Sequence, residues 1–258
     1  MNESRYLNRI GYTGTPMADL ATLKSILRCH VANIPFENLD IFYKTSYINL
    51  DLRAIYDKIV NVNRGGYCYE LNGLLCWLLK SIGFKVTMVA GRVARKNGYG
   101  PEMDHMALLV HLDDNKWLVD AGFGDFSTEP ILIGNSNEPA DFRLVEITVD
   151  SKKYLDAQKR KPATGQYTSE YIFTLKPHNF EDFAQRNHRQ QTEPGSFFLQ
   201  NLICSIPVKG GRYSIVNNRF VETISGIKKI TLIGTSREQA QLLKQYFNMD
   251  ASLVAVRA

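Results

Sequence analysis

Residues 64–83 read Arg-Gly-Gly-Tyr-Cys-Tyr-Glu-Leu-Asn-Gly-Leu-Leu-Cys-Trp-Leu-Leu-Lys-Ser-Ile-Gly, which joins a glycine turn, a cysteine and a strongly apolar segment. Leucine and isoleucine recur at helical spacing from Leu71 to Ile82, and Gly83 supplies a C-terminal stop. The pattern predicts a helix from about Tyr69 to Ile82.

Cys68 stands directly before this helix. The free N–H groups and the dipole of a helix N-terminus stabilise a thiolate, which lowers the pKa of a cysteine from about 8.5. Gly65 and Gly66 let the backbone turn tightly and approach a substrate closely. Cys68 is therefore a candidate nucleophile, and the alternative interpretation is a small buried hydrophobe, as most lone cysteines are.

A nucleophilic cysteine needs a base, and the base needs an acceptor that orients it. His105 and Asp120 are the candidates, on two predicted strands joined by the turn-forming residues 113–115. A two-residue turn that pairs Leu112 with Asn115 sets Asp120 on the same face as His105, whereas a three-residue turn separates them. We predict the two-residue turn. Considered one at a time, His105 also fits a structural histidine and Asp120 also fits a turn cap.

Two more helices are predicted upstream. Thr15 can cap and Pro16 suits the first position of a helix whose apolar residues recur at helical spacing until Pro35. Another helix is expected over residues 51–60. With the helix after Cys68, they form a helical bundle.

After Gly83 the chain becomes β-branched and alternating, which predicts a strand-rich region. A last helix is expected near Ser236, because Thr235 and Glu238 have capping-box spacing. The expected strands cover residues 84–93, 105–112, 116–120, 143–149, 170–175, 202–208, 213–216 and 227–233.

The composition is that of an ordinary globular protein: 258 residues, 44% hydrophobic and 22% charged, with a net charge of +5. No apolar run approaches the roughly 20 residues that span a bilayer, so no membrane association is expected. The first residues lack a basic segment followed by an apolar one, which predicts a cytoplasmic location.

Neither metal nor nucleic acid is an expected partner. Cys29, Cys76 and Cys204 fall in apolar patterns, and no Cys or His spacing suits a metal. The densest basic stretch runs from Lys152 to Lys161 and carries few aromatic residues that could stack on bases, so we interpret it as a solvated loop.

Several short motifs follow one another along nearly the whole chain. They are Pro35-Phe36-Glu37-Asn38, Arg64-Gly65-Gly66-Tyr67-Cys68 through Asn72, His105-Met106, Val119-Asp120-Ala121-Gly122-Phe123-Gly124, residues 172–177 and residues 196–205. Together, and in this order, they resemble the arylamine N-acetyltransferase family, in its bacterial members. The Arg-Gly-Gly-x-Cys element is highly specific.

The resemblance implies an α+β fold with a cysteine-protease-like catalytic core. The implied domains are an N-terminal helical bundle over residues 1–83 that carries the nucleophile, a central β-barrel over residues 84–190 that carries the histidine and the aspartate, and a C-terminal α/β lid over residues 191–258.

The resemblance also implies a chemistry. Cys68, His105 and Asp120 would form a triad, acetyl-CoA would acetylate Cys68, and coenzyme A would leave. An arylamine, an arylhydrazine or an aryl hydroxylamine would then attack the thioester in a ping-pong cycle. An aromatic amine is uncharged at neutral pH, so its lone pair is available.

Further residues follow from the same resemblance. Phe36, Tyr69 and Phe123 would line the acceptor pocket, and Gly124 would lie beside the coenzyme A path. Core packing is the alternative for the three aromatic residues.

We also expect effects from four charged residues near the cysteine loop and the coenzyme A path. Arg64 and Glu37 are expected to form a structural ion pair that holds the cysteine loop. Asp104 and Asp125 would add negative charge near the coenzyme path.

Two other functions fit parts of the pattern. A papain- or transglutaminase-like cysteine hydrolase would use the same triad geometry, and acetyl labelling of Cys68 without peptide cleavage would exclude it. A non-catalytic binding module would leave Cys68 inert toward alkylation. The sequence makes no prediction of the oligomeric state.

Overall fold

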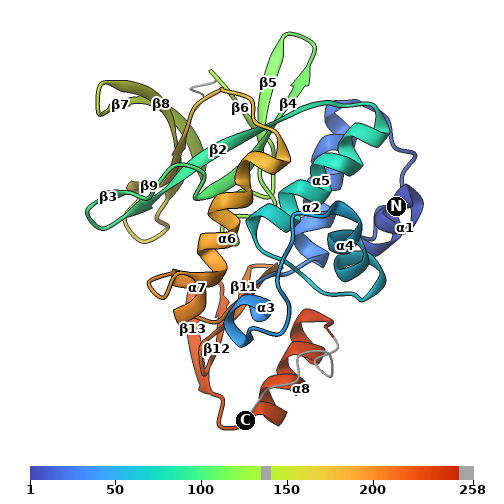
Figure 1. The fold of residues 1–258 in the computed structure, drawn as a ribbon, viewed down its shortest axis with the longest axis vertical. Helices are drawn as coiled ribbons and strands as arrows, with labels where there is room; N and C mark the ends of the chain where they lie inside the picture. The colour runs from blue at the N-terminus through green and yellow to red at the C-terminus, as the bar shows by residue number, and fades with distance from the viewer. Residues whose placement is uncertain (135–140, 250–258) are drawn as a thin grey trace.

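The computed structural model describes residues 1–134 and 141–249, and it combines helices with two antiparallel sheets (Figure 1). Helices dominate the first third, a barrel-like sheet follows, and a smaller sheet with a helix comes last. The expected mixed architecture is confirmed. The domain boundaries at residues 83 and 190 stay a prediction.

The N-terminal part is helical, as predicted, but one helix begins later than expected. α2 starts at Leu20 because the Asp19 side chain accepts the N–H of Thr22 at 2.7 Å, while Met17 lies 59% exposed outside the helix. Thr15 is therefore not the cap. The helices are α1 (Glu3–Arg9), α2 (Leu20–Asn33), α3 (Leu39–Tyr43), α4 (Leu52–Tyr56) and α5 (Cys68–Ile82), with a π-helical turn at Asp57–Asn61.

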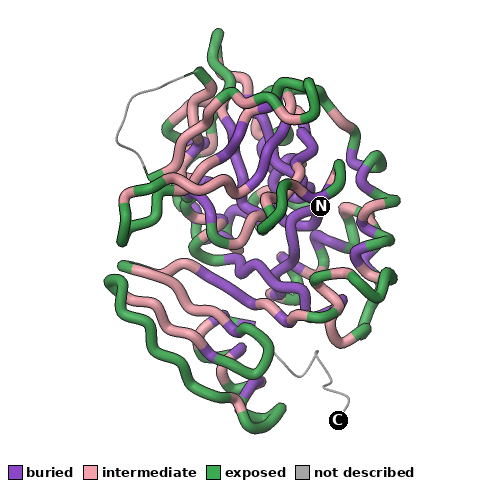
Figure 2. Tube along the Cα trace, turned by 90° about the vertical axis from the view of Figure 1, so that its left-hand side faces the viewer, coloured by how far each residue is buried: buried purple, intermediate pink, exposed green. Residues whose placement is uncertain are grey.

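α5 forms the centre of the core. Eleven of its fifteen residues are buried, and it packs against α1, α4 and two strands of the larger sheet, β2 (Lys85–Arg95) and β4 (His105–Leu112). Figure 2 shows the buried residues gathered in the interior of the molecule. A helix that is apolar all round belongs in an interior. Gly83, at φ +107°, ends the helix as predicted.

The larger sheet has eight strands in the order β6-β5-β4-β2-β9-β8-β7, with β3 paired to β2 at its side. Its strands pair in antiparallel fashion throughout the described residues, and the sheet curls into a barrel-like shape (Figure 1). Its other strands are β3 (Gly98–Tyr99), β5 (Asn115–Val119), β6 (Ile131–Leu132), β7 (Phe142–Val149), β8 (Lys152–Arg160) and β9 (Tyr167–Phe173).

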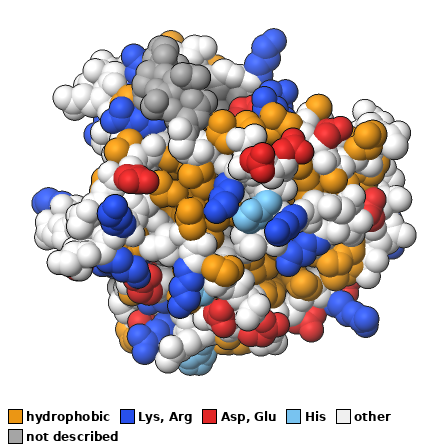
Figure 3. Space-filling model, turned by 90° about the horizontal axis from the view of Figure 1, so that it is seen from above, with side chains coloured by type: hydrophobic (Ala, Val, Ile, Leu, Met, Phe, Trp, Pro, Cys, Tyr) orange, Lys and Arg blue, Asp and Glu red, His pale blue; other side chains and the backbone are white. Residues whose placement is uncertain are grey.

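The basic stretch is a strand, so its interpretation as a loop is wrong. β8 pairs with both β7 and β9, and it buries Tyr154, Asp156 and Ala157 while Lys152 and Lys153 stay exposed. The exposed lysines make the stretch strongly charged, and this charge masked the buried positions that a strand presents to its other face. On the face shown in Figure 3, basic side chains are interspersed with acidic and apolar ones.

The β4–β5 hairpin has the predicted register. Leu112 pairs with Asn115 across a two-residue turn, in which Asp113 takes a left-handed conformation at φ +51°. The ladder continues to Leu108 opposite Val119, so the residue after β5 lies beside the start of β4.

The smaller sheet has the order β1-β10-β11-β12-β13, and its first strand comes from the helical part of the chain. Phe36 pairs with Ser205, which ties the segment before α3 to the C-terminal part. Strand β12 had no counterpart among the predicted strands. The strands are β1 (Phe36–Glu37), β10 (Ile203–Val208), β11 (Gly211–Val216), β12 (Arg219–Ile224) and β13 (Ile227–Leu232).

Helical segments complete the fold. A 3₁₀ turn at Phe180–Phe183 leads into α6 (Ala184–Thr192), and α7 (Phe197–Gln200) follows. α8 (Ser236–Phe247) begins as predicted, with the Thr235 hydroxyl accepting the Glu238 N–H at 3.2 Å. Within residues 1–134 and 141–249, none of the helices combines the length and the apolar character needed to cross a membrane.

Candidate active site

Cys68 is the first residue of α5 and only 4% exposed. Tyr67 is the N-cap, and its N–H donates to Glu70 Oε2 at 3.1 Å, which fixes the first turn. Gly65 serves packing rather than substrate approach, because a Cβ there would collide with the carbonyl oxygen of Pro35.

Burial changes the expected acidity of the nucleophile. Desolvation raises the pKa of the Cys68 thiol above its usual value, although the backbone N–H groups of Met106 and Tyr69 act in the opposite direction. The charges of Asp120 and Asp104 raise it further. The expectation that the helix N-terminus alone lowers this pKa is wrong, so a thiolate here needs a cationic partner.

His105 and Asp120 lie together, as the hairpin register predicts. His105 Nε2 is 2.7 Å from Asp120 Oδ2, and both side chains are at most 3% exposed. Burial opposes ionisation of the carboxyl, but His105 and hydrogen bonds from Asn72 and Gly122 hold the pKa of Asp120 below its usual value. The pairing at Nε2 leaves Nδ1 available to a neighbouring group.

Asn72 was not predicted as a site residue, yet it joins three parts of the site. Its amide nitrogen donates to Asp120 Oδ1 at 2.9 Å and to the Met106 carbonyl at 2.6 Å, and its oxygen accepts the Ala121 N–H at 2.9 Å. Its position in the sequence could have indicated this role, because a residue four positions after Cys68 lies on the same face of the helix.

Gly122 completes the contact between the loop after β5 and the start of α5. Its N–H donates to Asp120 Oδ1 at 2.9 Å, and a Cβ at this position would lie 2.7 Å from the Cα of Cys68. Only glycine allows this approach.

Cys68 and His105 line one cavity of about 820 Å³. The predicted residues Phe36, Phe123 and Gly124 line it as well. It is further lined by Val93, Arg95, Asp104, Asp125, Arg186, Gln190, Phe197, Phe198 and Ile203, among others. The structure therefore gathers most of the predicted site around one cavity, whose wall includes four phenylalanines.

Tyr69 lies elsewhere. It is fully buried outside the lining of this cavity, because its ring packs against Tyr67 and Phe183 and its hydroxyl donates to the Met103 carbonyl at 2.6 Å. The alternative of core packing describes this residue better than the predicted pocket position.

The two acidic residues near the cavity have cationic partners. Asp104 accepts from Arg186 at 2.6 Å and from Arg95 at 2.9 Å. Asp125 lies 2.7 Å from Lys159 and 3.2 Å from Arg212. The negative charge expected along the coenzyme path is therefore offset by neighbouring cations.

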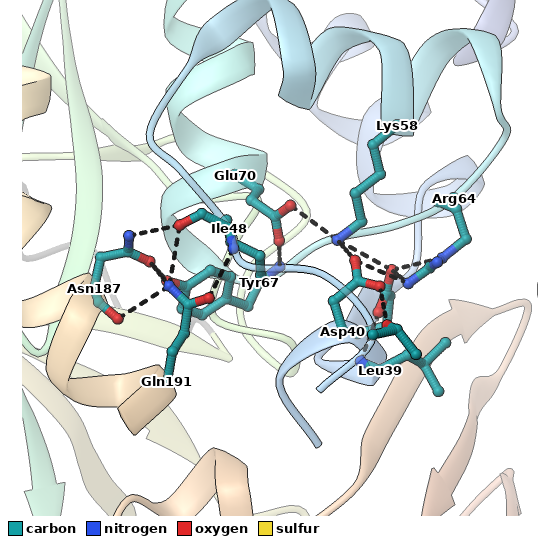
Figure 4. Close-up of polar contacts among 11 residues, drawn as sticks. Leu39, Asp40, Ile48, Lys58, Arg64, Tyr67, Glu70, Asn187 and Gln191 are labelled. Carbon is teal, nitrogen blue, oxygen red and sulfur yellow. Dashed lines mark hydrogen bonds and ion pairs between the residues drawn. The ribbon is translucent and has the colours of Figure 1, made fainter. Parts of the chain in front are cut away.

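The predicted ion pair of Arg64 with Glu37 is present at 2.9 Å and belongs to a larger buried network (Figure 4). Lys58 lies 2.8 Å from Asp40 and 2.9 Å from Glu70. Since Glu70 also binds the Tyr67 N–H, the network supports the backbone directly before Cys68.

Comparisons with known proteins identify the family of this chain. Residues 19–255 match the family model described as N-acetyltransferase. The pineal gland isozyme NAT-3 of arylamine N-acetyltransferase from Gallus gallus is 34% identical over 277 aligned positions, which cover 96% of this chain and 94% of that protein.

Two solved structures are similar over nearly their full length. The arylamine N-acetyltransferase of Mycobacterium abscessus has a TM-score of 0.90 at 26% identity, covering 98% of this chain and 93% of that one. The Mycobacterium marinum arylamine N-acetyltransferase, solved in complex with CoA, has a TM-score of 0.87 at 26% identity, covering 98% and 95%. The chain belongs to the arylamine N-acetyltransferase family of enzymes.

Proposed function

We propose that this enzyme transfers an acetyl group from acetyl-CoA to the nitrogen of arylamines and arylhydrazines, or to the oxygen of aryl hydroxylamines, through an acetyl-Cys68 thioester. The observation that carries the proposal is the buried His105–Asp120 pair, whose histidine lines the same cavity as Cys68. The similarity to an arylamine N-acetyltransferase solved with CoA supports the choice of donor.

In the first half-reaction, His105 accepts the thiol proton of Cys68, and Asp120 stabilises the resulting imidazolium. Opposite charges about 4 Å apart attract by about 4 kcal/mol at an effective dielectric constant near 20. An imidazolium that comes this close to the sulfur offsets the burial that opposes a thiolate. The sulfur attacks the acetyl carbonyl carbon, the bond to the coenzyme sulfur breaks, and His105 returns the proton to that sulfur.

In the second half-reaction, the neutral amine attacks the thioester carbon while His105 takes the proton that the nitrogen loses. The carbon–sulfur bond to Cys68 breaks, and the proton returns to the thiol. Phe36 and Phe123 support an aromatic acceptor because both line the cavity. The Asn72 bond to Asp120 keeps the base oriented through both steps.

Gly124 is the residue that we propose beside the coenzyme. It lines the cavity at φ +89° and has no side chain to narrow the path. We also propose a cytoplasmic location, which the four free cysteines support because thiols persist in a reducing compartment.

The direct test separates the two half-reactions. Incubation with acetyl-CoA alone should place one acetyl group on the peptide that contains Cys68, as mass spectrometry can locate. An arylamine added after removal of free coenzyme should discharge it, and initial-rate kinetics should be ping-pong.

Matched cysteine variants provide the controls. Cys68→Ser should remain unlabelled, whereas Cys76→Ser, eight residues along the same helix, should be labelled normally. Product formation by the wild type without any labelled intermediate would indicate direct transfer and contradict the role given to Cys68.

A further inference from the structure

Helix α6 is polar at every position after Ala184, yet it contributes buried side chains. Its sequence is Ala-Gln-Arg-Asn-His-Arg-Gln-Gln-Thr, and Asn187 and Gln190 are only 3% and 4% exposed. In Figure 1 the helix lies in the middle of the molecule, below the barrel-like sheet and above the smaller sheet. Buried polar groups are stable where they are hydrogen-bonded, so the partners of α6 indicate what it holds.

One partner is Tyr67, the residue before the nucleophile. Its hydroxyl donates to Asn187 Oδ1, and Asn187 Nδ2 donates to the Ile48 carbonyl at 2.9 Å (Figure 4). Gln191 supports the same junction by accepting the Ile48 N–H at 2.8 Å. Because Tyr67 has no exposed surface and caps α5, this contact fixes the backbone that leads into Cys68.

The other partner is Asp104, the residue before the base. Arg186 donates to Asp104 Oδ1 from Nη2 at 2.6 Å and from Nε at 3.0 Å. Gln190 Nε2 reaches the same oxygen at 3.3 Å, and Asp104 is 6% exposed. His105 opens β4 directly after this buried carboxylate. The contact therefore fixes the backbone that leads into His105.

We propose that α6 is a positioning helix. Asn187 holds the residue before Cys68, Arg186 and Gln190 hold the residue before His105, and one rigid element thereby sets the separation of thiol and imidazole. The inference rests on the proposed function, because separation matters only if the two groups exchange a proton. A misplacement of about 1 Å in such a pair can lower a rate by about 10²-fold.

Two variants release the two contacts separately. Tyr67→Phe removes one oxygen atom and no charge, whereas Arg186→Met removes the guanidinium that binds Asp104. Arg186→Lys keeps the charge and gives up the two-nitrogen contact. Arg189→Met is the control, because Arg189 lies on the same helix with its side chain 52% exposed and pairs with Glu193 at 3.6 Å.

The readout is the rate of Cys68 alkylation by iodoacetamide between pH 5 and pH 10, followed by mass spectrometry of the Cys68 peptide. Tyr67→Phe and Arg186→Met should each react about ten-fold more slowly at pH 7, with the midpoint of the profile about one pH unit higher. Arg186→Lys should fall between Arg186→Met and the wild type, and Arg189→Met should match the wild type.

A purely structural helix would give a different pattern. If both variants lose thermal stability but keep the wild-type pH profile, the positioning role is overturned. If Arg186→Met does not fold, Tyr67→Phe still decides, and its unchanged charge means that a shift reports position alone. A wild type without selective reaction at Cys68 would overturn the proposed function together with this inference, whereas wild-type-like variants would overturn this inference alone.

Discussion

Replacing Lys58 with Met should destabilise the folded protein, and the loss should depend strongly on pH. Lys58 Nζ lies 2.8 Å from Asp40 and 2.9 Å from Glu70, and its side chain is 16% exposed. Arg64, which the substitution does not change, lies 2.9 Å from Glu37 and 3.3 Å from Asp40. Glu70 is therefore the carboxylate that loses its cation.

Protonation of Glu70 limits the size of the loss. Burial already raises the pKa of Glu70 above 4.5 in the wild type, and without Lys58 the carboxyl can escape the penalty by binding a proton. Holding that proton costs about 1.36 kcal/mol for each pH unit above 4.5. The free energy of unfolding should thus fall by about 3.4 kcal/mol at pH 7 and by about 0.7 kcal/mol at pH 5.

The sign follows from linkage. The folded variant binds this proton more tightly than the unfolded chain, so the stabilisation is full below pH 4.5 and is lost as the pH rises. At about 2–4 °C for each kcal/mol in a chain of this size, Tm should fall by about 7–14 °C at pH 7.

Urea unfolding of wild type and Lys58→Met at pH 5 and pH 7 measures both quantities. The control is Lys228→Met, on the exposed strand β13, which should change the free energy of unfolding by less than about 0.5 kcal/mol. A loss below about 1 kcal/mol at pH 7, or equal losses at the two pH values, would refute the reasoning that Glu70 is orphaned.

Three other changes test the site and the core. Asp120→Asn should keep the fold, as circular dichroism can verify, and lower turnover by about 10⁴-fold, because an amide cannot stabilise the imidazolium; near-normal turnover would argue against the triad. Gly122→Ala should lower thermal stability and slow acetylation, since its Cβ would lie 2.7 Å from the Cα of Cys68, whereas Gly234→Ala, whose Cβ would come no nearer than 3.5 Å to another atom, should do neither. His30→Met should flatten the acid dependence of stability: burial lowers the pKa of His30 from 6.5 to about 3, so the unfolded state binds the proton first. Between pH 6.5 and pH 5, the free energy of unfolding from urea titrations should fall by about 2 kcal/mol more in the wild type than in the variant. The same dependence on pH in both proteins would contradict this assignment.

Local patterns predicted the elements whose signals lie within a few neighbouring residues. The apolar repeat after Cys68 and the glycine at its end predicted α5 to within a residue at each end. Turn chemistry at residues 113–115 predicted the hairpin, and the prediction of a two-residue turn, which places His105 beside Asp120, is confirmed. Side-chain alternation has a period of two, so a turn length is enough to choose the face.

Elements whose stability depends on distant partners were missed or misread. β8 appeared as a charged loop because its lysines face outward, and only the ladders with β7 and β9 make it a strand. Hydrogen bonds to Tyr67 and Asp104 hold α6 in place, so this helix needs no apolar stripe and has none. Periodicity cannot reveal a helix that is stabilised in this way.

The sequence by itself determined the candidate nucleophile, its place at a helix N-terminus, the hairpin that pairs base with acid, and the family. The tertiary structure decided the environment of these groups: the burial that raises the pKa of Cys68, the Asn72 bridge to Asp120, the cations that offset Asp104 and Asp125, and the pairing of β1 with β10. The reason is physical. Backbone preferences and turn geometry act between neighbours in the chain, whereas desolvation and charge pairing depend on side chains that only the completed fold brings within a few ångströms.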